Sequence, residues 1–171
     1  GRRIVTVHRT KDLKVINAIG FDGYDQVGRF SWANNERLVM SIERFKGWLE
    51  DPVTYGELFA INADGKKAMN IFGYRTGNGA SGVRTRKAEP IRAWGSISDL
   101  LPDDDKHILV RSVQMDSGWD SNPTIYKVNI YSGKRKKLYY SPVAAAYMLA
   151  DNGGQVRIAA GSNEAGDTQV Y

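Results

Sequence analysis

The side chains that could do chemistry in this chain lack the sequence context that the chemistry needs. A serine nucleophile needs a general base, usually histidine, and the two histidines of the sequence are His8 and His107. His8 follows a short apolar run and His107 lies where a hairpin is expected, so both are interpreted as structural residues. The G-x-S-x-G turn that exposes a hydrolase serine does not occur in the 171 residues. We therefore predict no catalytic residue in this chain.

Metal and cofactor sites are also not predicted. The chain has no cysteine, which removes disulfides and thiolate metal sites. Three consecutive aspartates at 103–105 could attract calcium or form an acid pair, but the matching turn at 33–35 is neutral, which favours a solvated hairpin. Residues 77–82 match G-x-G-x-x-G, yet the basic, non-periodic residues that follow supply no helix N-terminus for a pyrophosphate.

The charge pattern does not indicate a nucleic-acid or membrane partner. The formal charge of +5 is dispersed along the chain, and the densest basic run, at 134–137, follows Ser-Gly and is expected to lead from a turn into an exposed strand. Phosphate binding needs several such groups along one groove. No apolar stretch approaches the roughly 20 residues that a membrane-spanning helix needs, and the twin arginine near the N-terminus lacks the apolar segment of a signal peptide.

The elements that would position any site are predicted to be strands, and they occur in two matching series. Residues 34–40 and 104–110 place polar turn residues before an apolar run, which predicts a hairpin that leads into a buried strand. Residues 58–66 and 125–134 alternate apolar and polar side chains before Asp-Gly or Ser-Gly, which predicts a half-exposed strand and a tight turn. A last strand follows each of them, so each repeat holds four antiparallel strands.

Repeats of this kind are typical of β-propeller blades, although sandwiches and barrels are alternatives. The predicted fold class is all-β, a partial β-propeller of about three blades. We divide the single domain into a half blade at 1–27, a blade at 28–75, a loop at 76–94, a blade at 95–142 and a half blade at 143–171. Because a closed ring needs at least about four blades, we expect an open arc that could self-associate through exposed blade edges.

Two further features concern individual segments. Residues 143–150 contain strong helix formers, but so short a helix is marginal in water, so we predict a strand, with a short helix as the alternative. Trp48 and Trp119 lie in loops between the second and third strands of successive blades. They are candidate residues for a substrate-facing loop, and satellite packing is the alternative.

Four motifs lie in a fixed order along nearly the whole chain. They are FSWANNERLV at 30–39, YGELFAINADG at 55–65, DLLPDD at 99–104 with ILV at 108–110, and ADNGGQVR at 150–157. Together with the blade spacing, they resemble the N-terminal propeller of bacterial prolyl oligopeptidase family serine peptidases. The resemblance implies a larger protein, in which the propeller caps a C-terminal α/β-hydrolase domain, filters peptides by size and helps to shape the substrate cavity.

The resemblance carries no catalytic residue over to this chain, because the family's catalytic serine, aspartate and histidine belong to the hydrolase domain. Some relatives bind the amino terminus of the substrate through paired glutamates, and no Glu-Glu pair occurs here. The implied partners are the hydrolase domain and a peptide substrate, and the periplasm is favoured over the cytoplasm. Two functions stay open: a non-catalytic propeller that gates access to a peptidase, and a stand-alone propeller that binds a protein or peptide without enzyme activity.

Overall fold

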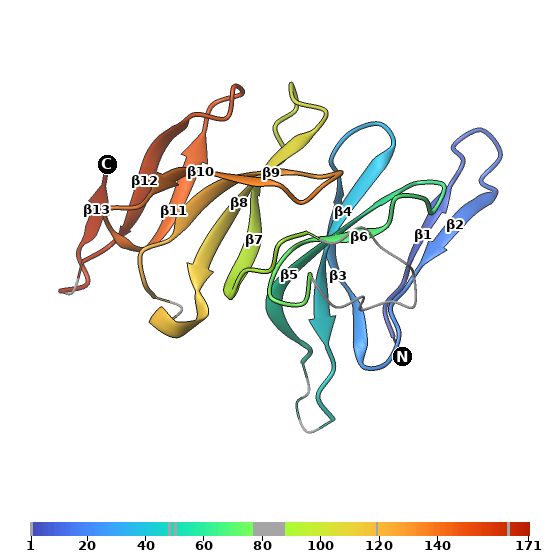
Figure 1. Ribbon diagram of the computed structural model, residues 1–171, viewed down its shortest axis with the longest axis horizontal. Coiled ribbons are helices and arrows are strands. Elements are labelled where there is room, and N and C mark those ends of the chain that lie inside the picture. The colour runs from blue at the N-terminus through green and yellow to red at the C-terminus, as the bar shows by residue number, and fades with distance from the viewer. Residues whose placement is uncertain (1, 48, 50, 77–87, 119, 164) are drawn as a thin grey trace.

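The chain folds into four antiparallel sheets that stand in a row (Figure 1). The computed structural model describes residues 2–47, 49, 51–76, 88–118, 120–163 and 165–171, and these form thirteen strands and one short 3₁₀ helix. The predicted all-β class is therefore confirmed. The two termini lie toward opposite ends of the row, and the described residues form an open arc rather than a closed ring (Figure 1).

Sheet A is a hairpin of two strands, β1 (Val5–His8) and β2 (Val15–Ile19). Sheet B has β3 (Asp25–Trp32), β4 (Arg37–Arg44), β5 (Val53–Asn62) and β6 (Met69–Phe72). Sheet C has β7 (Ala93–Asp99), β8 (His107–Gln114), β9 (Thr124–Asn129) and β10 (Arg135–Tyr140), with the 3₁₀ helix Met115–Ser117 after β8. Sheet D has β11 (Ala144–Ala150), β12 (Val156–Ser162) and β13 (Thr168–Val170).

The two four-stranded sheets are meanders, as the repeat predicts. In sheets B and C each strand is hydrogen-bonded to the next one along the chain, so β3 and β7 are edge strands. The first strand of each sheet starts slightly before the predicted blade boundary: β3 begins at Asp25 instead of 28, and β7 at Ala93 instead of 95.

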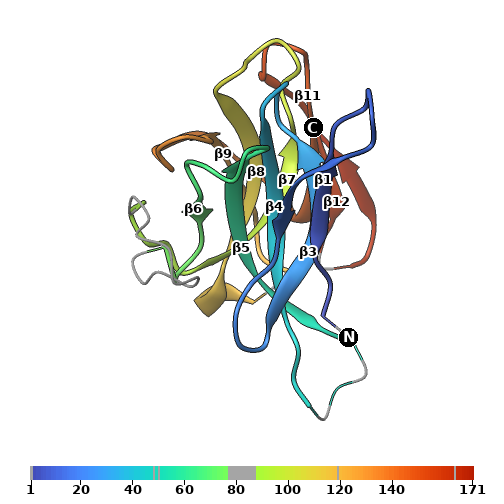
Figure 2. The same cartoon turned by 90° about the vertical axis from the view of Figure 1, so that its right-hand side faces the viewer.

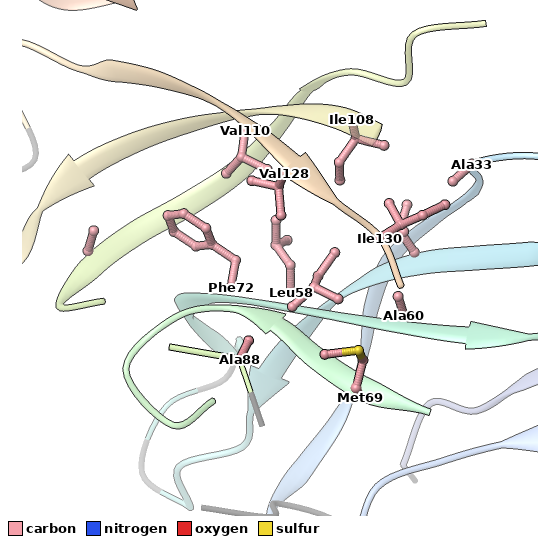
Figure 3. Packing of buried hydrophobic residues seen from close by; sticks show 13 residues of the cluster. Ala33, Leu58, Ala60, Met69, Phe72, Ala88, Ile108, Val110, Val128 and Ile130 are labelled. Carbon is pink, nitrogen blue, oxygen red and sulfur yellow. The ribbon is translucent and has the colours of Figure 1, made fainter. Parts of the chain in front are cut away.

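Apolar side chains fill the spaces between neighbouring sheets. Leu58, Ala60 and Phe72 of sheet B pack against Val110 and Val128 of sheet C in the largest of these clusters (Figure 3). Corresponding clusters join sheet A to sheet B and sheet C to sheet D. Seen from the end that carries β1, the sheets lie one behind the other (Figure 2). Stacking of apolar sheet faces therefore holds the row together.

One prediction of burial is wrong. The alternation in residues 58–66 predicts a half-exposed strand, but every residue from Gly56 to Asn62 in β5 is buried. Leu58 and Ala60 face sheet C, while Phe59 and Ile61 pack against sheet A. The strand is covered on both sides because the β1–β2 hairpin stacks on the face that was expected to be solvated.

The choice between strand and helix at residues 143–150 is also settled. Residues Ala144–Ala150 form β11. Met148 points into the cluster with Leu109 and Ile125 of sheet C, whereas its neighbours Tyr147 and Leu149 are exposed. This two-residue alternation buries one face, and packing therefore overrides the helix propensity of the alanines. No helix among the described residues is long and apolar enough to span a bilayer.

Candidate functional site

A pocket of about 660 Å³ lies between sheets B and C. The edge strands β3 and β7, parts of β4 and β5, and the turn after β7 form its wall. Its apolar lining includes Leu58, Ile97 and Leu100, and its hydroxyl groups include those of Ser31 and Ser41. A volume of this size is within the range of about 300 to 1,000 Å³ that is usual for ligand pockets. We call this pocket the β3–β7 groove.

Both edge strands carry a β-bulge at the groove. In β3 the register with β4 shifts between Val27 and Phe30, so that two residues stand opposite Ser41. The Ser41 hydroxyl accepts a hydrogen bond of 2.9 Å from the backbone N–H of Arg29 and thereby supports the bulge. A second shift, in β7, makes Ser98 the extra residue opposite β8. Because a bulge bends its strand and interrupts the ladder, the two bulges shape facing walls of the groove.

The small side chain at position 41 leaves the groove open. Arg111 holds the corresponding position in the second repeat, on the side of β8 that faces sheet D. Its Nε donates a hydrogen bond of 2.8 Å to the backbone oxygen of Ala146, so the guanidinium crosses from sheet C to sheet D. Ser41 instead bonds within sheet B. The space that an arginine occupies between sheets C and D is therefore available between sheets B and C.

The carboxylates of the groove wall already have partners within the chain. Oε2 of Glu43 lies 2.6 Å from Nη2 of Arg3. Oδ1 of Asp99 accepts a hydrogen bond of 2.7 Å from the backbone N–H of Leu101. Besides these carboxylates and the exposed Arg29, the lining consists of apolar side chains, hydroxyls and backbone.

A separate ion network lies at one end of sheet B. The guanidinium of Arg75 bonds both carboxylate oxygens of Glu57 and, at 2.9 Å, Oδ2 of Asp25. Arg44 bonds the same aspartate, with Nε 2.8 Å from Oδ1. Burial raises the pKa of Asp25, but the hydrogen bonds from Arg44 and Arg75 outweigh that effect and hold it below its usual value. Two cations balance two carboxylates, so we interpret the network as structural.

A second pocket, of about 480 Å³, lies over neighbouring turns of sheets B and C. Beneath it, the fully buried Arg37 donates from Nε to the backbone oxygen of Ile130 at 2.8 Å and from Nη1 to Oδ1 of Asn62 at 2.6 Å. Its guanidinium carbon lies 4.6 Å from the ring centre of Tyr131. Burial lowers the pKa of Arg37 to about 10. These contacts tie the two sheets together, and this pocket is the weaker candidate for a ligand.

The two histidines lie in structural surroundings, as interpreted from the sequence. The ring of His8 is hydrogen-bonded to the backbone oxygen of Leu13 and to the hydroxyl of Thr6. His107 lies 2.9 Å from Oδ1 of Asp104 through Nδ1, and its Nε2 faces the amide of Asn129. Neither ring is bonded to a serine hydroxyl among the residues that the structure describes.

The other sequence candidates separate into those that the structure describes and those that it does not. Trp48 and Trp119, the candidate substrate-facing residues, lie outside the described residues, as does the G-x-G-x-x-G match at 77–82. The aspartates at 103–105 precede β8 in a turn, and within the described ranges no group of three or more histidine, aspartate or glutamate side chains could hold a metal ion. The basic run at 134–137 leads into the exposed edge strand β10, which confirms its interpretation.

The residues of the β3–β7 groove were not identified from the sequence. Serines, leucines and an isoleucine in strands carry no motif, and bulges are not visible in a hydrophobic pattern. One signal was present: aligning the two repeats places Ser41 opposite Arg111, and a change from a large to a small side chain at a position between sheets marks a space.

No family model matches the chain, and neither a characterised protein nor a solved structure gives a match. The resemblance to prolyl oligopeptidase propellers therefore rests on the sequence motifs alone.

Proposed function

We propose that this chain is a non-catalytic module that binds an extended peptide segment in the β3–β7 groove. The observation that supports the proposal is a pocket of about 660 Å³ bordered by the edge strands of two neighbouring sheets. An edge strand presents backbone N–H and C=O groups along its free side. A peptide in extended conformation has the matching donors and acceptors, and its side chains can reach the apolar lining around Leu58 and Ile97.

The wider setting of this binding is proposed from the sequence resemblance. In a prolyl oligopeptidase family serine peptidase, the groove would receive peptide substrate and shape its access to a C-terminal α/β-hydrolase domain, in the periplasm. The alternative setting is a stand-alone propeller that binds a protein or peptide partner. The coding sequence that follows this segment distinguishes the two: a G-x-S-x-G motif with a later aspartate and histidine supports the peptidase setting.

A screen of blocked decapeptides tests the proposal. A library of fluorescent peptides is screened by anisotropy against the 171-residue chain, and the tightest peptide is carried forward. Ser41→Arg gives the groove an arginine at the position where Arg111 spans the space between sheets C and D. We expect this variant to bind the peptide at least about tenfold more weakly than the wild type. Ser31→Arg, on the half-exposed rim, is a second blocking variant with the same expectation. The matched control is Ser117→Arg, at an exposed site outside the groove, which should bind like the wild type.

Urea unfolding of each variant shows whether it is folded under the binding conditions. A failure of every peptide in the library to bind contradicts the proposal. Equal affinity of the wild type and a folded blocking variant also contradicts it, because the peptide then binds elsewhere.

A further inference from the structure

We infer that the peptide binds as an added strand on the free edge of β3, with backbone hydrogen bonds to Phe30 and Trp32. The inference rests on the proposed function and adds the binding mode, the register and the pattern of side chains that the groove selects. The free edges of β3 and β7 border the same groove, and the two strands differ in the room they leave for an added strand.

The register of β3 shows which backbone groups face outward. Ala33 donates its N–H to the backbone oxygen of Arg37 at 2.8 Å, so these two form a hydrogen-bonded pair at the end of the β3–β4 ladder. Hydrogen-bonded and non-hydrogen-bonded pairs alternate in an antiparallel ladder. Trp32, opposite Leu38, and Phe30, opposite Met40, are therefore non-hydrogen-bonded pairs. The N–H and C=O groups of Phe30 and Trp32 point away from β4, toward the free edge.

The same edge already makes one backbone hydrogen bond to the N-terminal segment of this chain. The backbone N–H of Val27 donates to the backbone oxygen of Arg3 at 3.2 Å. The Arg3 guanidinium is held by Glu43, with 2.6 Å between Nη2 and Oε2. One outward backbone group of β3 before the bulge is thus bonded within the chain, and in the described part of the chain no strand pairs with the edge after the bulge, at Phe30 and Trp32.

The edge of β7 is a poorer template. A Cβ placed on Gly56 of β5 would lie 2.1 Å from the backbone nitrogen of Gly95, so the backbones of β5 and β7 already touch there. An incoming peptide cannot run along the first half of β7 without displacing β5. The observations therefore favour β3.

The two faces of β3 predict the side chains of the peptide. Phe30 and Trp32 share one face and are 54% and 48% exposed, and Ser31 lies on the other face, in the lining of the groove. Side chains of a paired strand alternate in the same way. We expect aromatic or β-branched residues of the peptide beside Phe30 and Trp32, and the residues between them to enter the groove.

Amide hydrogen exchange and peptide N-methylation test the inference, with the tightest blocked decapeptide from the screen as the probe. On saturation with this peptide, exchange at Phe30 and Trp32 should slow by about tenfold or more, while Ser31, whose pair with Val39 is already hydrogen-bonded, changes little. In an added strand, every second peptide N–H points toward β3. N-methylation at one of these positions should weaken binding by about tenfold, and N-methylation at a position between them should leave the affinity nearly unchanged.

A proline variant tests the same hydrogen bonds from the protein side. Trp32→Pro removes the outward N–H and leaves the β3–β4 ladder intact, because proline is tolerated where the N–H faces away from the sheet. Its matched control is Trp32→Ala, which also removes the ring but keeps the donor. We expect the proline variant to bind the peptide at least about fivefold more weakly than the alanine variant, with equal urea midpoints.

The outcomes separate this inference from the proposed function. Binding that Ser41→Arg abolishes, without protection of Phe30 and Trp32 and with equal affinities of the two Trp32 variants, overturns the added strand and leaves the peptide module standing. Failure of all peptides to bind overturns both. Protection of the two amides that grows with protein concentration in the absence of peptide shows a second copy on the edge, and this also overturns the inference.

Discussion

Asn34 and Asp104 occupy the same turn position in the two repeats, and the side-chain oxygen of each accepts a hydrogen bond from a backbone N–H just before the strand that follows. Oδ1 of Asn34 accepts hydrogen bonds from the backbone N–H of Glu36 at 3.0 Å and of Arg37 at 2.9 Å. Oδ1 of Asp104 accepts from the backbone N–H of Lys106 at 3.0 Å, and its carboxylate also binds Lys127 and His107. The two repeats therefore share the same hydrogen bond in this turn, but its acceptor is a neutral amide at Asn34 and a charged carboxylate at Asp104. Burial raises the pKa of Asp104, but the bonds from Lys127 and His107 outweigh it and lower that pKa strongly.

This difference predicts a pH-dependent cost of Asp104→Asn. A carboxyl group whose pKa is lower in the folded state stabilises the fold above its unfolded pKa of about 3.9, and the contribution is lost as pH falls below that value toward the folded pKa. Asparagine keeps the hydrogen bond, as Asn34 does, but loses the charge. The variant should be about 1 kcal/mol less stable at pH 7, and the difference should shrink below about pH 4.

Urea unfolding of the wild type and the variant between pH 7 and pH 3 gives this difference directly. Asp103→Asn, at the exposed neighbouring position, is the control and should change stability little at any pH in that range. A cost of Asp104→Asn that stays constant down to pH 3 would show that the charge does not contribute.

A second prediction concerns Arg37, which joins sheets B and C. Besides Ile130 and Asn62, it binds the backbone oxygen of Lys67, with Nη2 at 2.9 Å. Arg37→Met keeps most of the volume but leaves three acceptors without this donor. Because each buried group that loses its partner costs about 1 to 3 kcal/mol, we expect a loss of at least about 3 kcal/mol in the free energy of unfolding.

Chemical denaturation measures this loss, and Arg92→Met is the matched control. Arg92 is exposed and pairs with the exposed Asp116, so its replacement should change stability by less than about 0.5 kcal/mol. The loss in the free energy of unfolding of Arg37→Lys should lie between those of Arg37→Met and Arg92→Met, because one ammonium group cannot reach all three acceptors. Equal stability of Arg37→Met and the control would contradict the role of Arg37 between the sheets.

A third prediction compares two glycines with nearly equal φ angles. Gly56 has φ +71° and Gly23 has φ +68°, so alanine is strained at both positions. At Gly23 a Cβ meets nothing within 4 Å, whereas at Gly56 it lies 2.1 Å from the backbone nitrogen of Gly95. We expect Gly23→Ala to cost about 1 kcal/mol, the conformational strain alone, and Gly56→Ala to cost several times more, because sheets B and C must separate.

Thermal unfolding of the two glycine variants gives the comparison. Similar melting temperatures would mean that the contact between β5 and β7 adjusts without cost. A much lower value for Gly56→Ala would confirm that this backbone contact sets the spacing between the sheets.

The strand order within the two four-stranded sheets could be predicted from the sequence because it depends on local patterns. The turn residues at 34–35 and 104–105 and the apolar runs after them identify β4 and β8. The burial of β5 could not be predicted in the same way. Its alternating pattern describes the strand, but the β1–β2 hairpin that covers its second face comes from a distant part of the chain.

The candidate site depends on features that sequence patterns do not encode. Bulges in β3 and β7 decide which residues face the groove, and each is a shift of one residue in a ladder. The groove is also lined by one small side chain, Ser41, where the next repeat has Arg111. Only the alignment of the two repeats makes that difference visible in the sequence.

The last prediction concerns Glu57, whose side chain is 2% exposed and binds the guanidinium of Arg75 with both oxygens. Glu57→Gln keeps the shape of the side chain but leaves Arg75 with Asp25 as its carboxylate partner. Removing one member of a buried ion pair costs about 3 to 5 kcal/mol, and we expect a loss in this range by urea unfolding. Glu89→Gln, at an exposed carboxylate that lies 3.5 Å from Nη2 of Arg135, should cost less than about 0.5 kcal/mol. If the two variants were equally stable, the Glu57–Arg75 pair would contribute no more to the free energy of unfolding than a surface ion pair does.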